Sequence, residues 1–107
     1  MAPAALHLAI DLGAGSGRAV LGGVVDSRFV LRETHRFHYS PRRAAGHLRW
    51  DFDRLIEGLH AGIRTAPAAA AELGGRLDSV GVDSWAVDYG LLDSDGRLVD
   101  EPVRSSR

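Results

Sequence analysis

Large aliphatic residues recur at every second position in the first run of the chain, at Leu6, Leu8 and Ile10. A period of two is typical of a strand with one buried face. After a glycine-rich stretch, residues 19–25 form a second apolar run, AVLGGVV, whose β-branched and glycine content favours a strand over a helix. The pattern predicts a strand-turn-strand hairpin in which Asp11 stands at the mouth of the first strand.

A third strand is predicted from Phe29 to Phe37, after the turn signal Asp26-Ser27. The residues from Tyr39 to Gly46 are then expected to form a polar loop. His35 and His38 lie three positions apart, which places them on opposite faces of a strand, so their spacing argues against a shared metal.

A helix is predicted after Asp51, which is a suitable N-cap. Apolar residues recur there with helical spacing, at Phe52, Leu55, Ile56, Leu59 and Ile63. Two glycines on the same segment, Gly58 and Gly62, indicate either close packing or a locally weak helix. Pro67 is expected to end this helix at the preceding residue, before a short second helical piece over residues 68–73.

A further strand is predicted from Leu77 to Val82, and it again ends in an acid, Asp83. A crossover helix between two strands implies that they pair in parallel. The fold class expected is therefore α/β with a mixed sheet and the order β-β-β-α-β. That order resembles the ribonuclease H-like N-terminal half-domain of the actin, hexokinase and heat-shock chaperone superfamily.

Composition narrows the class of protein further. The 107 residues suffice for one small domain at most. Thirteen basic and 14 acidic residues give a net charge of -1, so there is no basic field for nucleic acid. Cysteine is absent, which excludes disulfides and thiolate metal sites and favours a cytoplasmic setting. The opening residues 1–5 lack a basic segment, and no stretch is long and apolar enough for a membrane span.

The glycine-rich turn is a candidate phosphate site. Gly13, Gly15 and Gly17 allow positive φ and carry no Cβ, so backbone N–H groups can close around a phosphate, and Arg18 can add charge-assisted hydrogen bonds. A Walker loop is excluded because the chain has no lysine, and a dinucleotide fingerprint is excluded because Arg18 is followed by a strand pattern. The alternative is a tight hairpin whose glycines serve only the turn.

Asp11 begins this turn. A carboxylate beside a polyphosphate is repelled unless a cation lies between them, so Asp11 is interpreted as a group that orients Mg²⁺ or its water ligands.

The segment from Asp83 to Asp93, DSWAVDYGLLD, is the richest in functional side chains. Asp83 and Asp88 flank Trp85, an arrangement suited to a polyol, because carboxylates accept from hydroxyls and an aromatic face covers C–H groups. The alternative is a structural corner with a half-buried tryptophan. After this segment, residues 94–96 predict a hairpin turn and Leu98-Val99 the start of another strand.

Several segments together resemble the rhamnulokinase branch of the FGGY family of carbohydrate kinases. They are IDLGAGSGRAVL, ETHRFHY, LRWDFDRL, DSVGVDSWAVDYGLLDSDGRLV and PVRSSR, in that order. The opening motif is shared by much of the superfamily, whereas DSWAVDYGLLD is similar to a pattern more specific to this branch.

The resemblance implies binding of ATP with Mg²⁺ and of a sugar. The phosphates would lie against residues 13–18, and Asp11 would lie near the metal ion; the residues of the loop are Gly13, Ala14, Gly15, Ser16, Gly17 and Arg18. The backbone at Ala86 would face the sugar, with Trp85 and Asp88 beside it and Asp83 as a further acceptor. Kinases of this branch transfer the γ-phosphoryl group of ATP to the C1 hydroxyl of L-rhamnulose. The resemblance places their aspartate base past residue 107, so the chain alone is expected to be part of a domain and inactive.

Three residues depart from the family pattern. Ala86 stands where a glycine is usual, Ser105 where an aspartate is usual, and Gly15 where a serine is common. Two other interpretations stay open: a truncated remnant without enzymatic activity, and a nucleotide-binding module like that of actin or the chaperones. The DSWAVDY segment argues against the second, because a nucleotide binder needs no polyol site.

Overall fold

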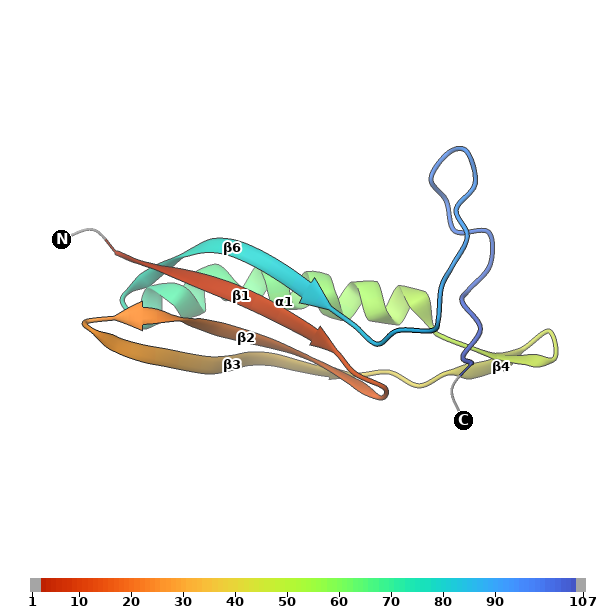
Figure 1. Cartoon of the computed structure of the whole chain (residues 1–107), viewed down its shortest axis with the longest axis horizontal. Helices are drawn as coiled ribbons and strands as arrows, with labels where there is room; N and C mark the ends of the chain where they lie inside the picture. The colour runs from red at the N-terminus through yellow and green to blue at the C-terminus, as the bar shows by residue number, and fades with distance from the viewer. Residues whose placement is uncertain (1–2, 106–107) are drawn as a thin grey trace.

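The computed structural model describes residues 3–105 of the chain. A four-stranded sheet with the order β3-β2-β1-β6 carries one helix on one face, and a small two-stranded hairpin lies at one end (Figure 1). The elements in chain order are β1 (Ala4–Leu12), β2 (Ser16–Val25), β3 (Arg28–His38), β4 (Arg42–Ala44), β5 (His47–Arg49), α1 (Phe52–Glu72) and β6 (Gly75–Asp83). The mixed sheet and the β-β-β-α-β order of its main elements are as predicted.

The register of the sheet brings charged residues of three strands together. β1 pairs with β2 in antiparallel fashion, which sets Asp11 opposite Arg18. β6 pairs with β1 in parallel after the crossover through α1, which sets Asp11 opposite Asp83. The predicted turn between β2 and β3 is formed by Asp26 and Ser27, which both have positive φ angles.

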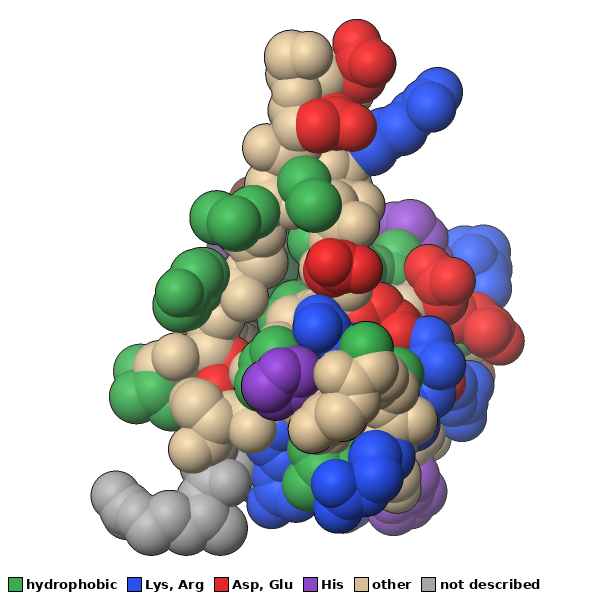
Figure 2. Space-filling model, turned by 90° about the vertical axis from the view of Figure 1, so that its right-hand side faces the viewer, with side chains coloured by type: hydrophobic (Ala, Val, Ile, Leu, Met, Phe, Trp, Pro, Cys, Tyr) green, Lys and Arg blue, Asp and Glu red, His purple; other side chains and the backbone are tan. Residues whose placement is uncertain are grey.

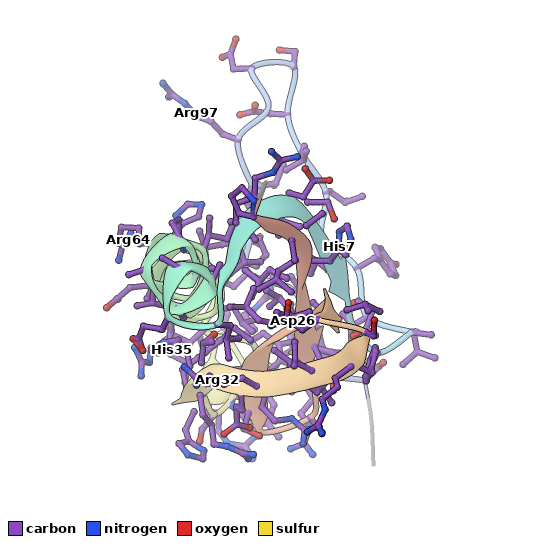
Figure 3. All side chains as sticks on the ribbon, turned by 90° about the vertical axis from the view of Figure 1, so that its left-hand side faces the viewer. His7, Asp26, Arg32, His35, Arg64 and Arg97 are labelled. Atoms are coloured by element: carbon purple, nitrogen blue, oxygen red, sulfur yellow. The ribbon has the colours of Figure 1, made fainter. Side chains whose placement is uncertain are left out.

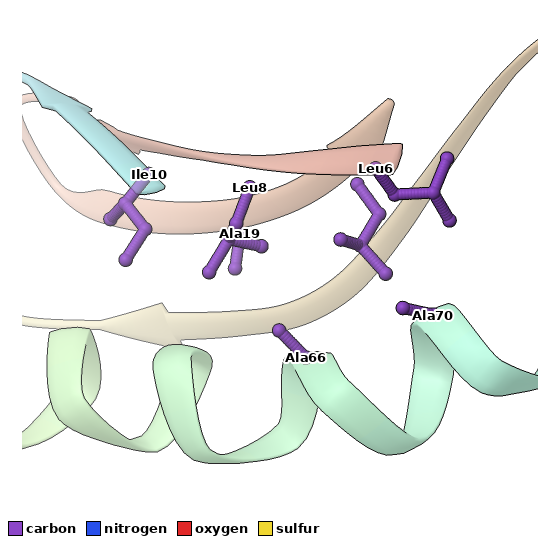
Figure 4. Close-up of a cluster of buried hydrophobic side chains, with 7 residues drawn as sticks. Leu6, Leu8, Ile10, Ala19, Ala66 and Ala70 are labelled. Carbon is purple, nitrogen blue, oxygen red and sulfur yellow. The ribbon is translucent and has the colours of Figure 1, made fainter. Parts of the chain in front are cut away.

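The core lies between the sheet and α1. The alternation of β1 places Leu6, Leu8 and Ile10 toward the helix, each no more than 2% exposed (Figure 4). The intervening His7 lies on the opposite face of the sheet (Figure 3). Burying such an aliphatic side chain contributes about 1.5–3 kcal/mol, so this one strand supplies a large part of the stability.

Small residues on α1 let the helix approach the sheet closely. A Cβ at Gly58 would overlap the Phe37 ring, and one at Gly62 would lie 3.1 Å from the Cβ of Ala19. The prediction of close packing at these two glycines is confirmed. The fully buried helix positions are Leu55, Gly58, Gly62, Ala66 and Ala70, so the core stripe is made of smaller residues than the predicted one.

The prediction that Pro67 ends the helix is wrong, because α1 continues through it to Glu72. Proline removes one backbone hydrogen bond, but Pro67 lies on the exposed face, where water can satisfy the carbonyl that loses its donor. The burial of Ala66 and Ala70 on either side, together with the high helix propensity of the alanines that follow, keeps the helix continuous.

Two other predicted elements differ from the structure. The segment predicted as a polar loop contains β4, which pairs with β5 across a turn at Ala45 and Gly46. The strand predicted at Leu98-Val99 is reduced to an isolated bridge between Leu92 and Leu98. The few backbone pairings available there do not extend into a ladder.

The segment after β6 returns to the end of the molecule that carries the small hairpin (Figure 1). The Trp50 amide donates to the carbonyl of Pro102, and the Arg104 amide donates to the carbonyl of Leu48, both at 2.8 Å. Of the PVRSSR segment, Ser106 and Arg107 lie outside the described residues. These bonds hold residues 102–104 beside the small hairpin and the start of α1.

Candidate functional site

Charged side chains meet at the edge of the sheet where β1 and β6 end. Arg18 donates from Nη2 to Oδ2 of Asp11 at 3.0 Å, and both side chains are about half exposed, at 46% and 49%. Asp83 lies beside Asp11 on the parallel neighbouring strand. A hydrogen bond with Asp11 and the negative charge of that carboxyl group raise the pKa of Asp83. The edge therefore holds two carboxyl groups that repel each other when both are ionised.

The glycine turn follows directly on this edge. The Gly13 amide donates to the Ser16 carbonyl at 2.9 Å, which closes the turn, and Ala14 and Gly15 form its exposed tip. The part of the sequence argument that relied on positive φ is wrong, because Gly13, Gly15 and Gly17 all lie outside the left-handed region.

The loop glycines have a steric reason instead. A Cβ on Gly17 would overlap the Phe37 ring, whereas a Cβ on Gly15 would meet no atom within 4 Å. Gly17 is therefore required by packing below the turn, and open space surrounds Gly15 on the side where a ligand can approach.

Tyr39 holds the turn from below, and sequence analysis missed it. Its hydroxyl lies 2.5 Å from the Gly13 carbonyl and 3.0 Å from the Ser16 carbonyl. Its backbone N–H donates to the Gly15 carbonyl at 3.3 Å. The signal was present, because Phe37 and Tyr39 continue the period-two pattern of β3, and both are buried.

A cluster around Asp88 lies next to Tyr39. Trp50 and Trp85 donate their indole N–H groups to Oδ2 of Asp88, at 2.7 and 2.8 Å. Ser105 donates to Oδ1 through its backbone N–H at 3.0 Å and also through its hydroxyl. The Tyr39 ring stacks against Trp85 with centroids 6.5 Å apart. These contacts connect the glycine turn to the DSWAVDY segment.

The four donors determine the ionisation of Asp88. Burial by itself would raise the pKa of this carboxyl group, but the hydrogen bonds from Ser105, Trp50 and Trp85 outweigh burial and lower the pKa to about 2. A carboxylate offers about four lone-pair directions, and protein donors use that number here. Asp88 was predicted as an acceptor for sugar hydroxyls, and its oxygens accept from these protein donors in the structure.

The backbone beside Asp88 is strained. Val87 has a φ of 77°, a conformation that is unfavourable for a β-branched side chain, and it is 72% exposed. Asp88, the residue after Val87, is held in place by its hydrogen bonds, and these bonds so maintain the conformation of Val87. Strain of this kind concentrates at binding sites, where the surrounding structure over-determines the backbone.

Two hollows flank this segment, with volumes of about 310 and 190 Å³. They share Asp88, Tyr89, Gly90 and Pro102 in their walls. The smaller is mainly apolar and also contacts Trp50 and Trp85. Figure 2 faces the end of the molecule that carries the small hairpin and shows hydrophobic side chains along one flank. Large exposed hydrophobic residues of the C-terminal segment are Val87, Tyr89, Leu91, Leu92, Val99 and Val103.

The predicted site residues thus form two groups. Asp11, Arg18 and Asp83 meet at the sheet edge beside the glycine turn, whereas Trp85 and Asp88 lie in the aromatic cluster. Ala86, which lies between Trp85 and Asp88 in the sequence, is exposed. Tyr39 contacts the glycine turn beside the first group through its hydroxyl and Trp85 of the second group through its ring.

Comparison with known proteins agrees with the resemblance found in the sequence. No protein-family model matches the chain. The rhamnulokinase of Ligilactobacillus salivarius is 37% identical to it over 97 residues, which is 91% of this chain and 19% of that protein. The rhamnulokinase of Lactiplantibacillus plantarum is 35% identical over the same share of both chains. The chain therefore spans about a fifth of the length of these curated relatives.

Solved structures show the same fold. A gluconate kinase from Lactobacillus acidophilus superposes with a TM-score of 0.70 and 14% identity, over 94% of this chain and 19% of that one. A ligand-bound xylulose kinase from the same organism gives 0.69 and 14%, over 92% and 19%. The expected fold class is confirmed. Among residues 3–105, no helix is both long and apolar enough to cross a bilayer.

Proposed function

We propose that this chain forms the phosphate-binding and sugar-contacting part of a carbohydrate kinase. Its similarity to rhamnulokinases of the FGGY family of sugar kinases, over 91% of its length, supports this proposal. The glycine turn would hold the phosphates of ATP, and the DSWAVDY segment would hold a ketose. The resemblance to the rhamnulokinase branch makes L-rhamnulose the proposed ketose and its C1 hydroxyl the proposed acceptor of the phosphoryl group.

The observation that carries this proposal is the placement of Asp11 and Asp83. They are register partners on neighbouring parallel strands, at the carboxyl ends of both. Ligands of open α/β sheets bind outside the carboxyl ends of the strands. The glycine turn begins two residues after Asp11, and Trp85 follows two residues after Asp83. The end of β1 would therefore bind the phosphates, and the end of β6 would bind the sugar.

The residues at this edge fit a divalent cation. Asp83 holds its proton more tightly than usual because it faces Asp11, and a cation bound by Asp11 would offset the negative charge that causes this. Carboxylate oxygens are ligands that Mg²⁺ prefers. Among the described residues, no group of three or more His, Cys, Asp or Glu side chains gathers, so phosphate oxygens and water would complete the coordination. When bound, Mg²⁺ would neutralise charge on the phosphates.

On the sugar side, Trp85 and Ala86 are proposed to make the direct contacts. An indole face covers the C–H groups of a sugar, and a backbone carbonyl or amide can bond its hydroxyls. Asp83 is proposed as the carboxylate acceptor. Asp88 is proposed to hold Trp85 in position, because its oxygens already accept from four protein donors.

The reaction proposed for the complete kinase is transfer of the γ-phosphoryl group. The bond from the γ-phosphorus to the ADP oxygen breaks, a bond from the phosphorus to the C1 oxygen forms, and the hydroxyl proton passes to a base. Catalysis of this kind consists mostly of positioning and charge neutralisation. The residues of this chain would supply the positioning, and the base would come from another part of the kinase.

The test measures the binding of ligands to the 107-residue chain through changes in its tryptophan fluorescence and its melting temperature. Mg-ATP and L-rhamnulose are titrated separately, with D-xylulose and L-fuculose as comparison sugars. We expect each of the first two ligands to raise the melting temperature, since a ligand that binds only the folded state stabilises it. A response to Mg-ATP without any sugar would favour the nucleotide-binding module, and a chain without cooperative melting would favour the remnant.

The variant Trp85→Ala tests whether the sugar binds beside Trp85. We expect it to weaken L-rhamnulose binding at least tenfold while Mg-ATP binding changes by less than threefold, since one buried aromatic contact is worth roughly 1–2 kcal/mol or more. Phe29→Ala is the matched control, because Phe29 is an exposed aromatic residue on β3, 72% exposed. Equal losses of both ligands in Trp85→Ala would contradict a sugar site at this residue.

A further inference from the structure

Tyr39 is the residue through which the glycine turn and the aromatic cluster touch. Its side chain is 4% exposed. The hydroxyl contacts the carbonyls of Gly13 and Ser16, and the ring stacks on Trp85 and meets Trp50 edge-on with centroids 6.1 Å apart. The resemblance assigned no role to this tyrosine, and nothing in the proposed function yet uses it.

The contacts of Tyr39 determine which way the peptide groups of the turn face. The carbonyls of Gly13, Gly15 and Ser16 are all directed toward Tyr39, the first and third by its hydroxyl and the second by its backbone N–H. In a trans peptide the N–H of the next residue points opposite to the carbonyl, and the described residues contain no cis peptide. The N–H groups of Ala14 and Ser16 therefore point away from Tyr39.

The tip of the turn lies next to these donors and is open to solvent. Ala14 and Gly15 are exposed, and the space around the Cβ position of Gly15 is open for at least 4 Å. A concavity of backbone N–H groups is a general anion-binding arrangement. Without the bonds from Tyr39, the Gly13 and Gly15 peptides could rotate and present carbonyl oxygens to the same space, which would repel a phosphate.

The hydroxyl remains a donor across the physiological range. Burial raises the pKa of Tyr39, and the negative charge of Asp11 adds to that effect, which brings the pKa to about 12. The phenol is thus protonated at neutral pH, and its proton is shared between two carbonyl oxygens.

We propose that Tyr39 is a positioning residue that keeps the Gly13–Ser16 turn in its phosphate-binding shape and fixes it to Trp85 of the sugar segment. This inference rests on the proposed function and deepens it. The contrasting interpretation is a buried tyrosine that contributes only to stability, as many do. The two differ in one respect: only a positioning residue changes nucleotide binding more than it changes sugar binding.

The variant that separates them is Tyr39→Phe. It keeps the ring against Trp85 and Trp50 and removes only the hydroxyl. Thr34→Val is the matched control, because it removes a hydroxyl that donates to the Ala19 carbonyl at 3.3 Å; Thr34 lies on β3, the strand that Tyr39 directly follows, and away from the turn. Each variant removes one hydroxyl group, which contacts two carbonyls in Tyr39 and one in Thr34, so both test the loss of a hydroxyl-to-backbone contact.

We expect Tyr39→Phe to weaken binding of Mg-ATP by roughly fivefold to tenfold, the equivalent of about one hydrogen bond, and to leave L-rhamnulose binding within twofold. Amide hydrogen exchange of residues 13–17 should accelerate in Tyr39→Phe, and it should keep the wild-type rate in Thr34→Val. Thr34→Val should bind both ligands as the wild type does.

Three results would overturn the inference: wild-type Mg-ATP affinity in Tyr39→Phe, equal weakening of both ligands, or unchanged exchange of the turn amides. Failure of the proposed function gives a different result, because the wild type itself would then fail to bind Mg-ATP, L-rhamnulose or both. If the wild type does not bind Mg-ATP, the inference fails as well in its phosphate role, whatever the exchange rates of the variants.

Discussion

Trp50 and Trp85 lie with their ring centroids 4.6 Å apart and donate their indole N–H groups to the same carboxylate oxygen, Oδ2 of Asp88. Trp50 lies two residues before α1, whereas Trp85 follows β6, so the two rings join the start of the helix to the segment after the last strand. One carboxylate holds both of them. Its charge and its four acceptor directions are therefore central to the shape of the proposed sugar site.

We expect Asp88→Asn to lower the free energy of unfolding by about 2–3 kcal/mol. Asparagine keeps the shape of the side chain but turns one oxygen into an N–H₂ group, which then faces donors and leaves them unsatisfied. Urea unfolding measures this. Asp93→Asn is the control, because Asp93 accepts from the amides of Asp95 and Arg97 in an exposed turn, through one oxygen that asparagine retains. Equal losses in the two variants would contradict the role of Asp88.

The stability of the fold should fall between about pH 4 and pH 2. The pKa of Asp88 is lowered from 3.8 to about 2 in the folded chain. A carboxyl group with a lowered pKa stabilises the fold above its unfolded pKa, and that contribution is lost as the pH falls through the folded pKa. The measurement is the free energy of unfolding from pH 6 to pH 2. The wild type should approach Asp88→Asn at the acidic end, and a constant difference between them would refute the assignment.

Asp11→Ala should abolish detectable binding of Mg-ATP while the chain stays folded. The ion pair of Asp11 with Arg18 is exposed, and such pairs contribute about 0–1 kcal/mol, so its loss should not unfold the protein. Calorimetric titration and a thermal melt give both quantities. Asp78→Ala is the control, since Asp78 forms a comparable exposed pair with Arg76 on β6. If Asp11→Ala binds Mg-ATP with wild-type affinity, Asp11 does not orient the metal ion.

Val87→Gly should leave the stability unchanged or raise it by up to about 1 kcal/mol. The left-handed backbone at Val87, with a φ of 77°, costs a β-branched residue about 1–2 kcal/mol, and glycine avoids that cost. The gain is offset in part by the greater freedom of glycine in the unfolded chain. Val99→Gly is the control in the same segment, where φ is not positive, and it should destabilise. A loss in Val87→Gly as large as that in Val99→Gly would show that the backbone there is not strained.

Most of the sheet could be predicted from local pattern. The alternation at Leu6, Leu8 and Ile10 identified β1 and its buried face, and the helical spacing after Asp51 located the start of α1. These two predictions succeeded because burial of one face makes apolar residues recur every two residues along a strand and every 3.6 residues along a helix. The continuation of α1 through Pro67 could not be predicted, because it depends on which face of the helix is buried.

The site shows the same division. Asp11, Asp83, Trp85 and Asp88 stood out in the sequence by residue type and spacing, and Tyr39 did not. Its importance comes from contacts with Gly13 and Ser16, which follow from the pairing of β3 with β2 and the bend of the turn. A tyrosine after a strand gives no local sign of which carbonyls its hydroxyl will meet.

The sequence by itself determined the order of the elements, the charged ends of two strands and the glycine turn, because these depend on periodicity and residue type over a few neighbouring positions. Only the tertiary structure decided that Asp11 lies beside Asp83, that Asp88 gives its oxygens to Trp50, Trp85 and Ser105, and that Tyr39 joins the two groups. The physical reason is that each of these contacts joins segments brought together by strand pairing and by burial of aromatic rings, and neither is encoded within any one segment.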